Sequence, residues 1–132
     1  MGKENKKKIL LVEDDMATIE VYKRALEQAG FEVNPIITGG EAVRRLQEID
    51  KDPSQKPDLV LLDLILPDMD GIDILKVIRG LDNVKDVKVF ILTNYGDKEL
   101  EAKGLLLKSE RYILKTDCVP TNLAKLVKKE LK

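Results

Sequence analysis

The chain has 132 residues, of which 43% are hydrophobic and 36% charged, a length and composition that fit one globular domain. Histidine is absent and Cys118 is the one cysteine, which excludes a disulfide framework, a Cys/His zinc site and histidine-based catalytic pairs. The 23 basic and 24 acidic side chains leave a net charge of -1, unlike the strongly basic balance of domains that bind nucleic acid directly.

Lysines gather near the N-terminus, but no apolar stretch of signal-peptide length follows them. We therefore expect residues 1–7 to form a frayed or disordered tail and residues 8–132 to form the domain. The longest apolar runs, Ile9 to Val12 and Leu59 to Ile65, are too short to cross a bilayer. These features predict a cytoplasmic protein that contacts neither a membrane nor nucleic acid.

Runs of β-branched residues and leucines alternate five times with segments of helical periodicity, which is typical of βαβ units around a parallel sheet. The predicted fold is therefore α/β, with a doubly wound five-stranded parallel sheet and five helices in a three-layer sandwich. In chain order, strands are expected over Lys8 to Val12, Phe31 to Ile37, Leu59 to Leu62, Val87 to Leu92 and Arg111 to Leu114.

Glycine and proline mark several ends of the predicted helices. Gly30 suits the position after the C-cap of the first helix, and Gly80 is expected to close the third. The fourth helix, over about residues 97–108, contains Gly104, which weakens it by about 1 kcal/mol relative to alanine. The last helix is expected to begin near Pro120, because proline is favoured in a first turn.

Polar side chains follow the ends of four predicted strands. In an open parallel sheet, ligands bind beyond the carboxyl ends of the strands, so these side chains are expected to surround one small site. Neighbouring carboxylates repel unless a cation neutralises them, and the oxygen ligands suit Mg²⁺. The residues are Glu13, Asp14 and Asp15 after the first strand, Asp63 after the third, Thr93 after the fourth and Lys115 after the fifth.

Asp63 is the residue expected to react. A carboxylate can be a covalent nucleophile, and phosphoryl transfer needs mainly positioning and positive charge around the phosphoryl oxygens. Mg²⁺, the Lys115 ammonium and the Thr93 hydroxyl would supply that stabilisation. The sequence therefore favours phosphoryl chemistry on Asp63.

The stretches ILLVEDD, PDLVLLDLILPDMDG, VFILTN and YILK occur in this order, with 30 residues from Asp63 to Thr93 and 22 from Thr93 to Lys115. In these motifs and intervals the chain resembles the receiver domains of two-component response regulators, the CheY-like family, from about Lys8 onward. The resemblance implies a flavodoxin-like strand order of 2-1-3-4-5. Because no output domain follows, a stand-alone, single-domain receiver is expected.

The resemblance also implies the ligands of the metal. Asp14 and Asp63 would bind Mg²⁺ together with the backbone carbonyl of Ile65, and Glu13 would reach the ion through a water. Mn²⁺ could replace Mg²⁺.

The resemblance further implies which residues accept the phosphoryl group, contact it and change conformation in response. Asp63 would be phosphorylated by a sensor histidine kinase or a phosphotransfer protein, and Thr93 and Lys115 would contact the phosphoryl group. Tyr112 would be the switch aromatic that signals to an unknown output protein in trans. The chain would be a monomer or a phosphorylation-dependent dimer, and not an enzyme beyond its own phosphorylation and dephosphorylation.

Three positions depart from the family's usual pattern. Thr116 stands where proline commonly follows the lysine, Asn94 replaces a small residue, and Lys108-Ser-Glu replaces a common Gly-Ala before the fifth strand. These departures bear on rates and partners, because none of them removes a chemical group.

Other polar residues have simpler interpretations. Asp15 is expected to cap a helix, Asp68, Asp70 and Asp73 to be loop and first-turn residues, and Cys118 to be an inert small apolar residue. Tyr95 could partly shield the acceptor.

Two other functions stay open at this point. A constitutive interaction module, or pseudo-receiver, would keep the fold without phosphoryl turnover. A small Mg²⁺-dependent phosphohydrolase would be expected to carry a second aspartate two residues after the nucleophile, where this chain has Ile65.

Overall fold

The computed structural model describes residues 6–94 and 96–132. Tyr95, and residues 1–5 of the expected N-terminal tail, lie outside the described residues. Lys7 already takes part in the sheet, because its carbonyl accepts a hydrogen bond of 2.9 Å from the Glu32 N–H.

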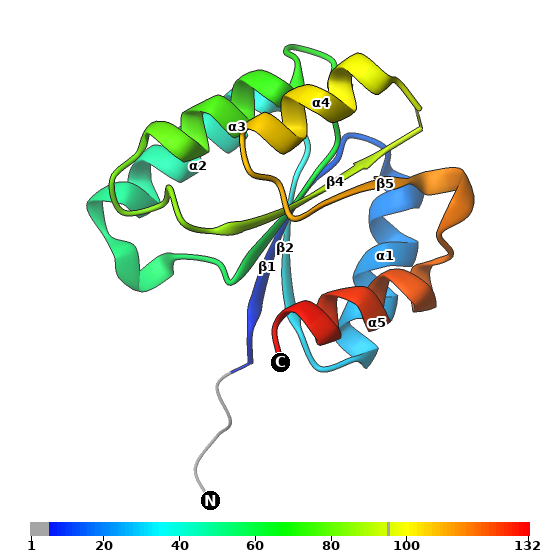
Figure 1. Cartoon of the computed structure of the whole chain (residues 1–132). Helices are drawn as coiled ribbons and strands as arrows, with labels where there is room; N and C mark the ends of the chain where they lie inside the picture. The colour runs from blue at the N-terminus through cyan, green and yellow to red at the C-terminus, as the bar shows by residue number, and fades with distance from the viewer. Residues whose placement is uncertain (1–5, 95) are drawn as a thin grey trace, which may run out of the picture.

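Strands and α-helices alternate along the described chain (Figure 1). The strands are β1 (Lys8–Val12), β2 (Glu32–Ile36), β3 (Leu59–Leu62), β4 (Lys88–Thr93) and β5 (Arg111–Leu114). The helices are α1 (Met16–Gln28), α2 (Gly39–Lys51), α3 (Gly71–Gly80), α4 (Lys98–Leu106) and α5 (Pro120–Glu130). All strand pairs are parallel and the strand order is β2-β1-β3-β4-β5, which confirms the predicted fold class.

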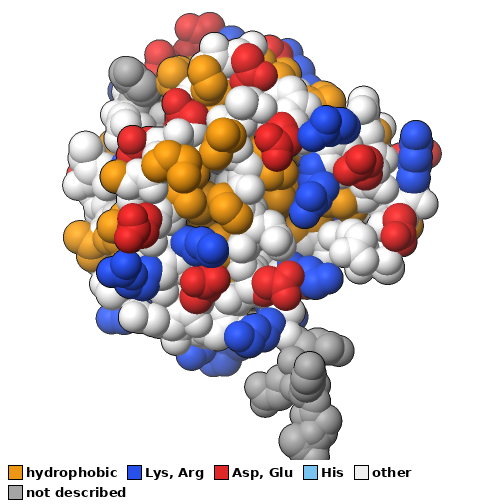
Figure 2. All heavy atoms as spheres, turned by 180° about the vertical axis from the view of Figure 1, so that it is seen from behind, with side chains coloured by type: hydrophobic (Ala, Val, Ile, Leu, Met, Phe, Trp, Pro, Cys, Tyr) orange, Lys and Arg blue, Asp and Glu red, His pale blue; other side chains and the backbone are white. Residues whose placement is uncertain are grey.

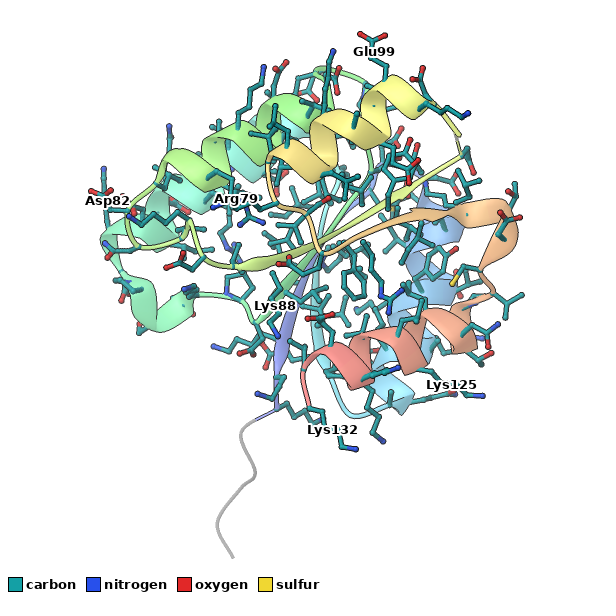
Figure 3. All side chains as sticks on the ribbon, in the orientation of Figure 1. Arg79, Asp82, Lys88, Glu99, Lys125 and Lys132 are labelled. Carbon is teal, nitrogen blue, oxygen red and sulfur yellow. The ribbon has the colours of Figure 1, made fainter. Side chains whose placement is uncertain are left out.

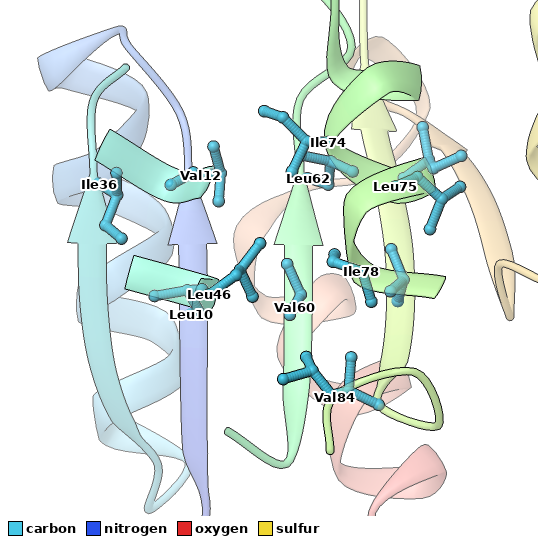
Figure 4. Packing of buried hydrophobic residues seen from close by; sticks show 14 of the residues in the cluster. Leu10, Val12, Ile36, Leu46, Val60, Leu62, Ile74, Leu75, Ile78 and Val84 are labelled. Carbon is cyan, nitrogen blue, oxygen red and sulfur yellow. The ribbon is translucent and has the colours of Figure 1, made fainter. Parts of the chain in front are cut away.

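Successive side chains of each strand point to opposite faces of the sheet, which divides the core into two layers. On β1, Leu10 and Val12 belong to a cluster with α2 and α3, whereas Ile9 and Leu11 pack with α1 and α5. Figure 4 shows the first cluster, in which Leu46 of α2 lies over the sheet. Because the strands are covered on both faces, they read as continuous apolar runs in the sequence.

The edge strand β2 contains a proline. The Glu32 N–H and the Ile36 carbonyl are both bonded toward β1, each at 2.9 Å. Pro35, one residue before Ile36, therefore has its nitrogen on the side away from β1. The ladder between β1 and β2 loses no hydrogen bond there, which is why an edge strand tolerates proline.

Helix α1 ends as its sequence predicts. Gly30 has a φ of 99° and its N–H donates to the Glu27 carbonyl, while the Phe31 N–H donates to Leu26, as in a Schellman motif. Because this turn uses the Phe31 N–H, β2 begins one residue later than predicted. Gly80 differs from expectation: it is the last residue of α3, and the chain leaves through an extended Leu81 instead of a left-handed glycine.

Helix α4 ends in the same kind of turn without glycine. The Lys108 N–H donates to Leu105 and the Ser109 N–H to Gly104, and Lys108 takes the left-handed conformation with a φ of 62°. Gly104 is the buried residue of α4. A Cβ at Gly104 would lie 2.6 Å from Cδ1 of Ile91, so the glycine that weakens the helix also lets it approach β4.

Arg79 of α3 holds this end of α4 in place (Figure 3). Its guanidinium donates to the carbonyls of Leu107 and Lys108, both at 2.8 Å. It also donates to Lys85 at 2.9 Å and Val87 at 2.7 Å, just before β4. Nothing in the sequence pattern pointed to this role, because the four acceptors are backbone atoms.

Asp68 joins the loop after β3 to the N-terminus of α2. Its Oδ1 accepts from the Gly39 N–H at 2.7 Å and its Oδ2 from the Gly40 N–H at 2.8 Å. The bonds from Gly40 and Gly39 lower the pKa of Asp68 below its ordinary value of 3.8. The predicted loop role of Asp68 therefore includes a long-range cap on α2.

Replacing Asp68 with asparagine is expected to destabilise the protein at neutral pH, because the amide offers one acceptor oxygen to two N–H groups. A folded-state pKa below 3.8 means that the ionised group stabilises the fold above that pH. The contribution is lost as pH falls through the lower, folded-state pKa. Chemical unfolding should show that the parent has the larger free energy of unfolding at neutral pH and that the difference between the two proteins disappears in strong acid. A difference that persists in acid would contradict this account.

The surface away from these features carries mixed charge. Figure 2 shows acidic and basic side chains interspersed over the middle of the rear face, in keeping with the near-zero net charge. Among the helices in the described part of the chain, none combines the length and apolar character needed to cross a membrane.

Candidate functional site

The strand register brings the predicted site residues to one edge of the sheet. Val12 pairs with Leu62, and Leu62 pairs with Ile91, so Glu13 and Asp63 leave neighbouring strands at the same level. Thr93 pairs with Leu114, which places Lys115 directly beyond β5. Three central strands therefore end together, as the sequence predicts.

Three carboxylates meet at this edge. Oxygen atoms of Glu13, Asp14 and Asp63 all lie within 4.8 Å of one another. Glu13 and Asp63 are buried, and Asp14 is exposed to solvent. The cluster, called the acidic pocket below, thus combines two buried carboxylates with one that is exposed to solvent.

Lys115 crosses to this pocket from β5. Its ammonium forms an ion pair with Oε1 of Glu13 and lies 3.3 Å from Oδ2 of Asp63. Burial alone would lower the pKa of Lys115, but the hydrogen bond with Glu13 and the charge of Asp63 outweigh burial and raise it. The lysine is therefore a fixed positive charge at neutral pH.

Glu13 has a different balance of forces. Burial raises the pKa of its carboxyl above the ordinary value of 4.5, and the hydrogen bonds from Lys115 and from the Asp15 N–H oppose this shift without cancelling it. The family resemblance led us to expect that Glu13 contacts the metal through a water. In the structure the Glu13 carboxylate forms an ion pair with Lys115, and its role in binding a metal stays a prediction.

The carboxylate of Asp63 is held by its own loop. Its Oδ1 accepts a hydrogen bond of 3.2 Å from the Ile65 N–H, while Oδ2 faces Lys115. Gly71, at the start of α3, packs on the backbone here, and a Cβ on it would lie 2.3 Å from the Asp63 carbonyl oxygen and 2.7 Å from Cα of Leu64. Only the absence of that Cβ lets α3 begin so close to Asp63.

The donor set fits a divalent cation. Three carboxylates and one ammonium leave an excess of two negative charges (-3 + 1 = -2), which an ion such as Mg²⁺ would balance. Hard divalent ions prefer oxygen ligands, and the carboxylates of Glu13, Asp14 and Asp63 are close enough to share one ion. Ile65, whose backbone carbonyl is the further predicted ligand, lies in the loop immediately after Asp63.

Thr93 and Tyr112, the two residues of the predicted switch, are buried to different extents. Thr93 is fully buried at the end of β4, and Tyr112 is half-buried on β5. Burial raises the pKa of the Tyr112 hydroxyl, against a hydrogen bond with the backbone of Asp97. A hollow of about 370 Å³ lined by Tyr112, Gly96, Leu126 and others lies between α4 and α5, so the ring has space beside it.

The positions that depart from the family pattern can now be located. Thr116 lies in a short 3₁₀ helix, Lys115–Asp117, and all described peptide bonds are trans. Asn94 is exposed beyond β4. Lys108 forms the left-handed end of α4 described above.

Asp15, Asp70 and Cys118 fit their simpler interpretations. Asp15 caps α1 by accepting from the Thr18 N–H, and Asp70 caps α3 by accepting from Ile72. Cys118 is buried in the core beside α1 and α5.

The comparisons with known proteins agree on one family. The model of the response regulator receiver domain matches residues 9–128. The phosphate regulon transcriptional regulatory protein PhoB of Rhizobium meliloti is 33% identical over 119 residues, a region that covers 90% of this chain and 50% of PhoB. The chain thus spans about half the length of the curated relatives it matches.

Solved structures with the same fold include receivers. The CheY-like response regulator receiver domain protein from Methanospirillum hungatei aligns with a TM-score of 0.83 at 30% identity, covering 96% of this chain and 94% of that one. The phosphorylated cyanobacterial phytochrome response regulator RcpA aligns with a TM-score of 0.80 at 31% identity, covering 96% and 91%.

Proposed function

This chain belongs to the family of response regulator receiver domains, and from that premise we propose that it is a phosphorylation switch whose acceptor is Asp63. The observation that carries the proposal is the meeting of Asp63 with Glu13, Asp14 and Lys115 at the carboxyl end of the sheet. One reactive carboxylate, two further acidic groups and one ammonium are the parts that phosphoryl transfer to an aspartate requires.

In the chemical step, an oxygen of Asp63 attacks phosphorus. The new O–P bond forms as the P–N bond of a donor phosphohistidine breaks, and the imidazole leaves with the bonding electron pair. Lys115 stabilises the charge on the phosphoryl oxygens from its place beside Oδ2. No general base is needed, because the attacking group is a carboxylate and carries no proton to remove. Water later hydrolyses the acyl phosphate and restores the carboxylate.

Mg²⁺, or Mn²⁺ in its place, supplies positive charge that neutralises the carboxylates and the phosphoryl oxygens when bound. We propose that Asp14, Asp63 and the backbone carbonyl of Ile65 hold it, with Glu13 acting through a water. The excess of negative charge in the pocket supports this assignment.

The switch is proposed to run from Thr93 to Tyr112. A phosphoryl group adds a charge of about -1.5 to -2, which draws the Thr93 hydroxyl toward it. Tyr112 then moves into the space that Thr93 leaves, and the surface of α4, β5 and α5 changes with it. The hollow beside Tyr112 supports the idea that the ring has two available positions.

Donor and output are proposed from the family. A sensor histidine kinase or a phosphotransfer protein would donate the phosphoryl group in the cytoplasm, and an output protein would bind the switched surface. The chain would act as a monomer or as a dimer formed on phosphorylation. The relatives that are transcriptional regulators support a place in signal transduction.

The direct test is incubation with Mg²⁺ and acetyl phosphate. We expect an acid-stable, hydroxylamine-labile adduct that peptide mapping places on Asp63, and no adduct when EDTA is present. A folded, metal-binding protein that gains no adduct would refute phosphoacceptor function and favour a constitutive interaction module.

Replacing Lys115 with methionine is expected to slow adduct formation about 100-fold or more, since one preorganised positive donor commonly has that effect. The rate is measured by intact-protein mass spectrometry. Lys51→Met, on the exposed end of α2, is the control and should react normally. Circular dichroism and urea unfolding of Lys115→Met separate lost folding from lost chemistry, because Glu13 loses its buried partner in this variant. A normal rate in folded Lys115→Met would contradict the assigned role.

A further inference from the structure

A basic groove lies at the end of the sheet where the strands begin, whereas Asp63 lies where they finish. A hollow of about 500 Å³ opens between the end of α1, the start of β2 and α5. Its apolar part comes from Ala29, the buried Phe31 and the half-buried Leu131. The exposed side chains around it are all lysines, namely Lys7, Lys125, Lys128, Lys129 and Lys132.

The groove continues along the two helices. A second hollow of about 260 Å³ between α1 and α5 shares Ala29, Lys125 and Lys128 with the first. Figure 3 shows the labelled Lys125 and Lys132 at the same lower edge of the molecule, on α5 and just beyond it. The concave region is therefore longer than either hollow alone.

The lysines of this groove have no partners of opposite charge among the described residues, since none of the ion pairs found there involves them. Glu130, the acidic residue within α5, is instead paired with Lys88 at 3.2 Å. On α5, Lys128 and Lys129 follow Lys125 by three and four residues, so both lie next to it on the helix surface, and Lys132 follows just beyond the helix. Like charges on one helix face repel, and an anionic ligand would relieve that repulsion.

We propose that this groove binds an acidic segment of a partner protein that carries an apolar side chain. The apolar side chain lies against Phe31 and Leu131, and the carboxylates contact the surrounding lysines. A hollow with an apolar floor does not match a flat bilayer surface. It also offers no exposed aromatic ring for stacking a nucleic-acid base, because Phe31 is 6% exposed.

The size of the groove sets the length of the segment. From Lys125 to Glu130, the end of α5, the helix rises by about 8 Å at roughly 1.5 Å per residue, and Lys132 lies two residues further along the chain. An extended peptide covers that distance in about three residues, at roughly 3.3 Å each. The groove and the acidic pocket share no residues, so binding does not require phosphorylation of Asp63.

The test uses the full chain and a fluorescein-labelled peptide of aspartates and glutamates around a single leucine, followed by fluorescence anisotropy. We expect saturable binding that weakens as salt is raised. A peptide with serine in place of leucine should bind several-fold more weakly. A single-stranded oligonucleotide of equal charge should bind more weakly than the leucine peptide.

Charge reversal locates the site. The double variant Lys125→Glu, Lys128→Glu should lose about tenfold or more in affinity, since each exposed ion pair contributes a few-fold. Lys51→Glu is the control, because Lys51, like Lys128, lies in the last turn of a helix, and it should bind normally. Lys125→Gln, Lys128→Gln gives a milder loss and guards against misfolding of the reversed variant. Asp63→Asn should bind like the parent chain, which keeps this test separate from that of the phosphoacceptor.

Several outcomes would overturn the proposal. Absence of binding, or equal binding by the double variant and Lys51→Glu, would show that the groove is not the site. Equal affinity for the serine peptide, or higher affinity for the oligonucleotide, would make it a general anion surface. Self-association of the chain that the double variant abolishes would assign the groove to a second copy.

Discussion

A chain carrying Asp63→Asn is expected to gain no phosphoryl group from acetyl phosphate, while the parent chain is modified at that residue. The amide nitrogen and oxygen lack the charge and nucleophilicity of the carboxylate. The amide oxygen of the substituted side chain can keep the hydrogen bond from the Ile65 N–H, so the loop retains its support. The substitution is therefore expected to abolish phosphorylation and to change the stability of the fold only slightly.

Asp15→Asn is the matched control for this prediction. Asp15 lies next to the pocket but caps α1 through its side chain, and asparagine is an equally good cap. This variant should be phosphorylated at the normal rate. Mass spectrometry gives the extent of modification, and circular dichroism confirms folding. An adduct of unchanged yield on Asp63→Asn would move the acceptor to another residue.

Asp63→Asn also distinguishes a phosphorylation switch from a constitutive interaction module. If phosphorylation drives output, a partner that binds the parent chain after acetyl phosphate treatment will not respond to Asp63→Asn. If the surface is constitutive, both chains will bind the partner equally, with or without phosphoryl donor.

Gly71→Ala is expected to destabilise the protein by about 1–3 kcal/mol, as overpacking of a close contact commonly does. The added Cβ would lie 2.3 Å from the Asp63 carbonyl oxygen and 2.7 Å from Cα of Leu64. Both are backbone atoms, so no side chain can rotate away, and either α3 or the acceptor loop must shift. Phosphorylation of Asp63 should slow as well, because the loop that positions it moves.

Gly80→Ala, at the other end of the same helix, is the control. A Cβ at Gly80 meets nothing within 4 Å, and this glycine does not have a positive φ. Alanine there should stabilise by about 0.4–1 kcal/mol through the unfolded state. Urea unfolding of the three proteins measures both effects. Equal stability of Gly71→Ala and the parent would show that α3 does not constrain the acceptor loop.

The fold could be predicted because its signals are local. Strand residues such as Leu59 to Leu62 form short apolar runs, and Gly30 marks the end of α1 in the way its left-handed backbone requires. Parallel strands bring their carboxyl ends to one edge, and the strand order that the family resemblance implied then predicted that Asp63 and Lys115 lie together.

The contacts that sequence reasoning missed depend on how loops return to the sheet. Arg79 donates to backbone carbonyls, and because every residue has one, the sequence does not show which carbonyls will be the acceptors. Asp68 caps a helix that begins 29 residues earlier. Lys115 takes Glu13 as its first partner, a choice between neighbouring carboxylates that side-chain positions decide.

Pro35 in β2 has a consequence for assembly. The outer edge of a sheet is a template on which strands of other molecules can add and start aggregation. At Pro35 that edge lacks the N–H that an added strand would need, so a sixth strand could not form an unbroken ladder there. The ordered addition of a strand along β2 is thereby disfavoured, which leaves β5 as the edge of the sheet that a further strand could extend.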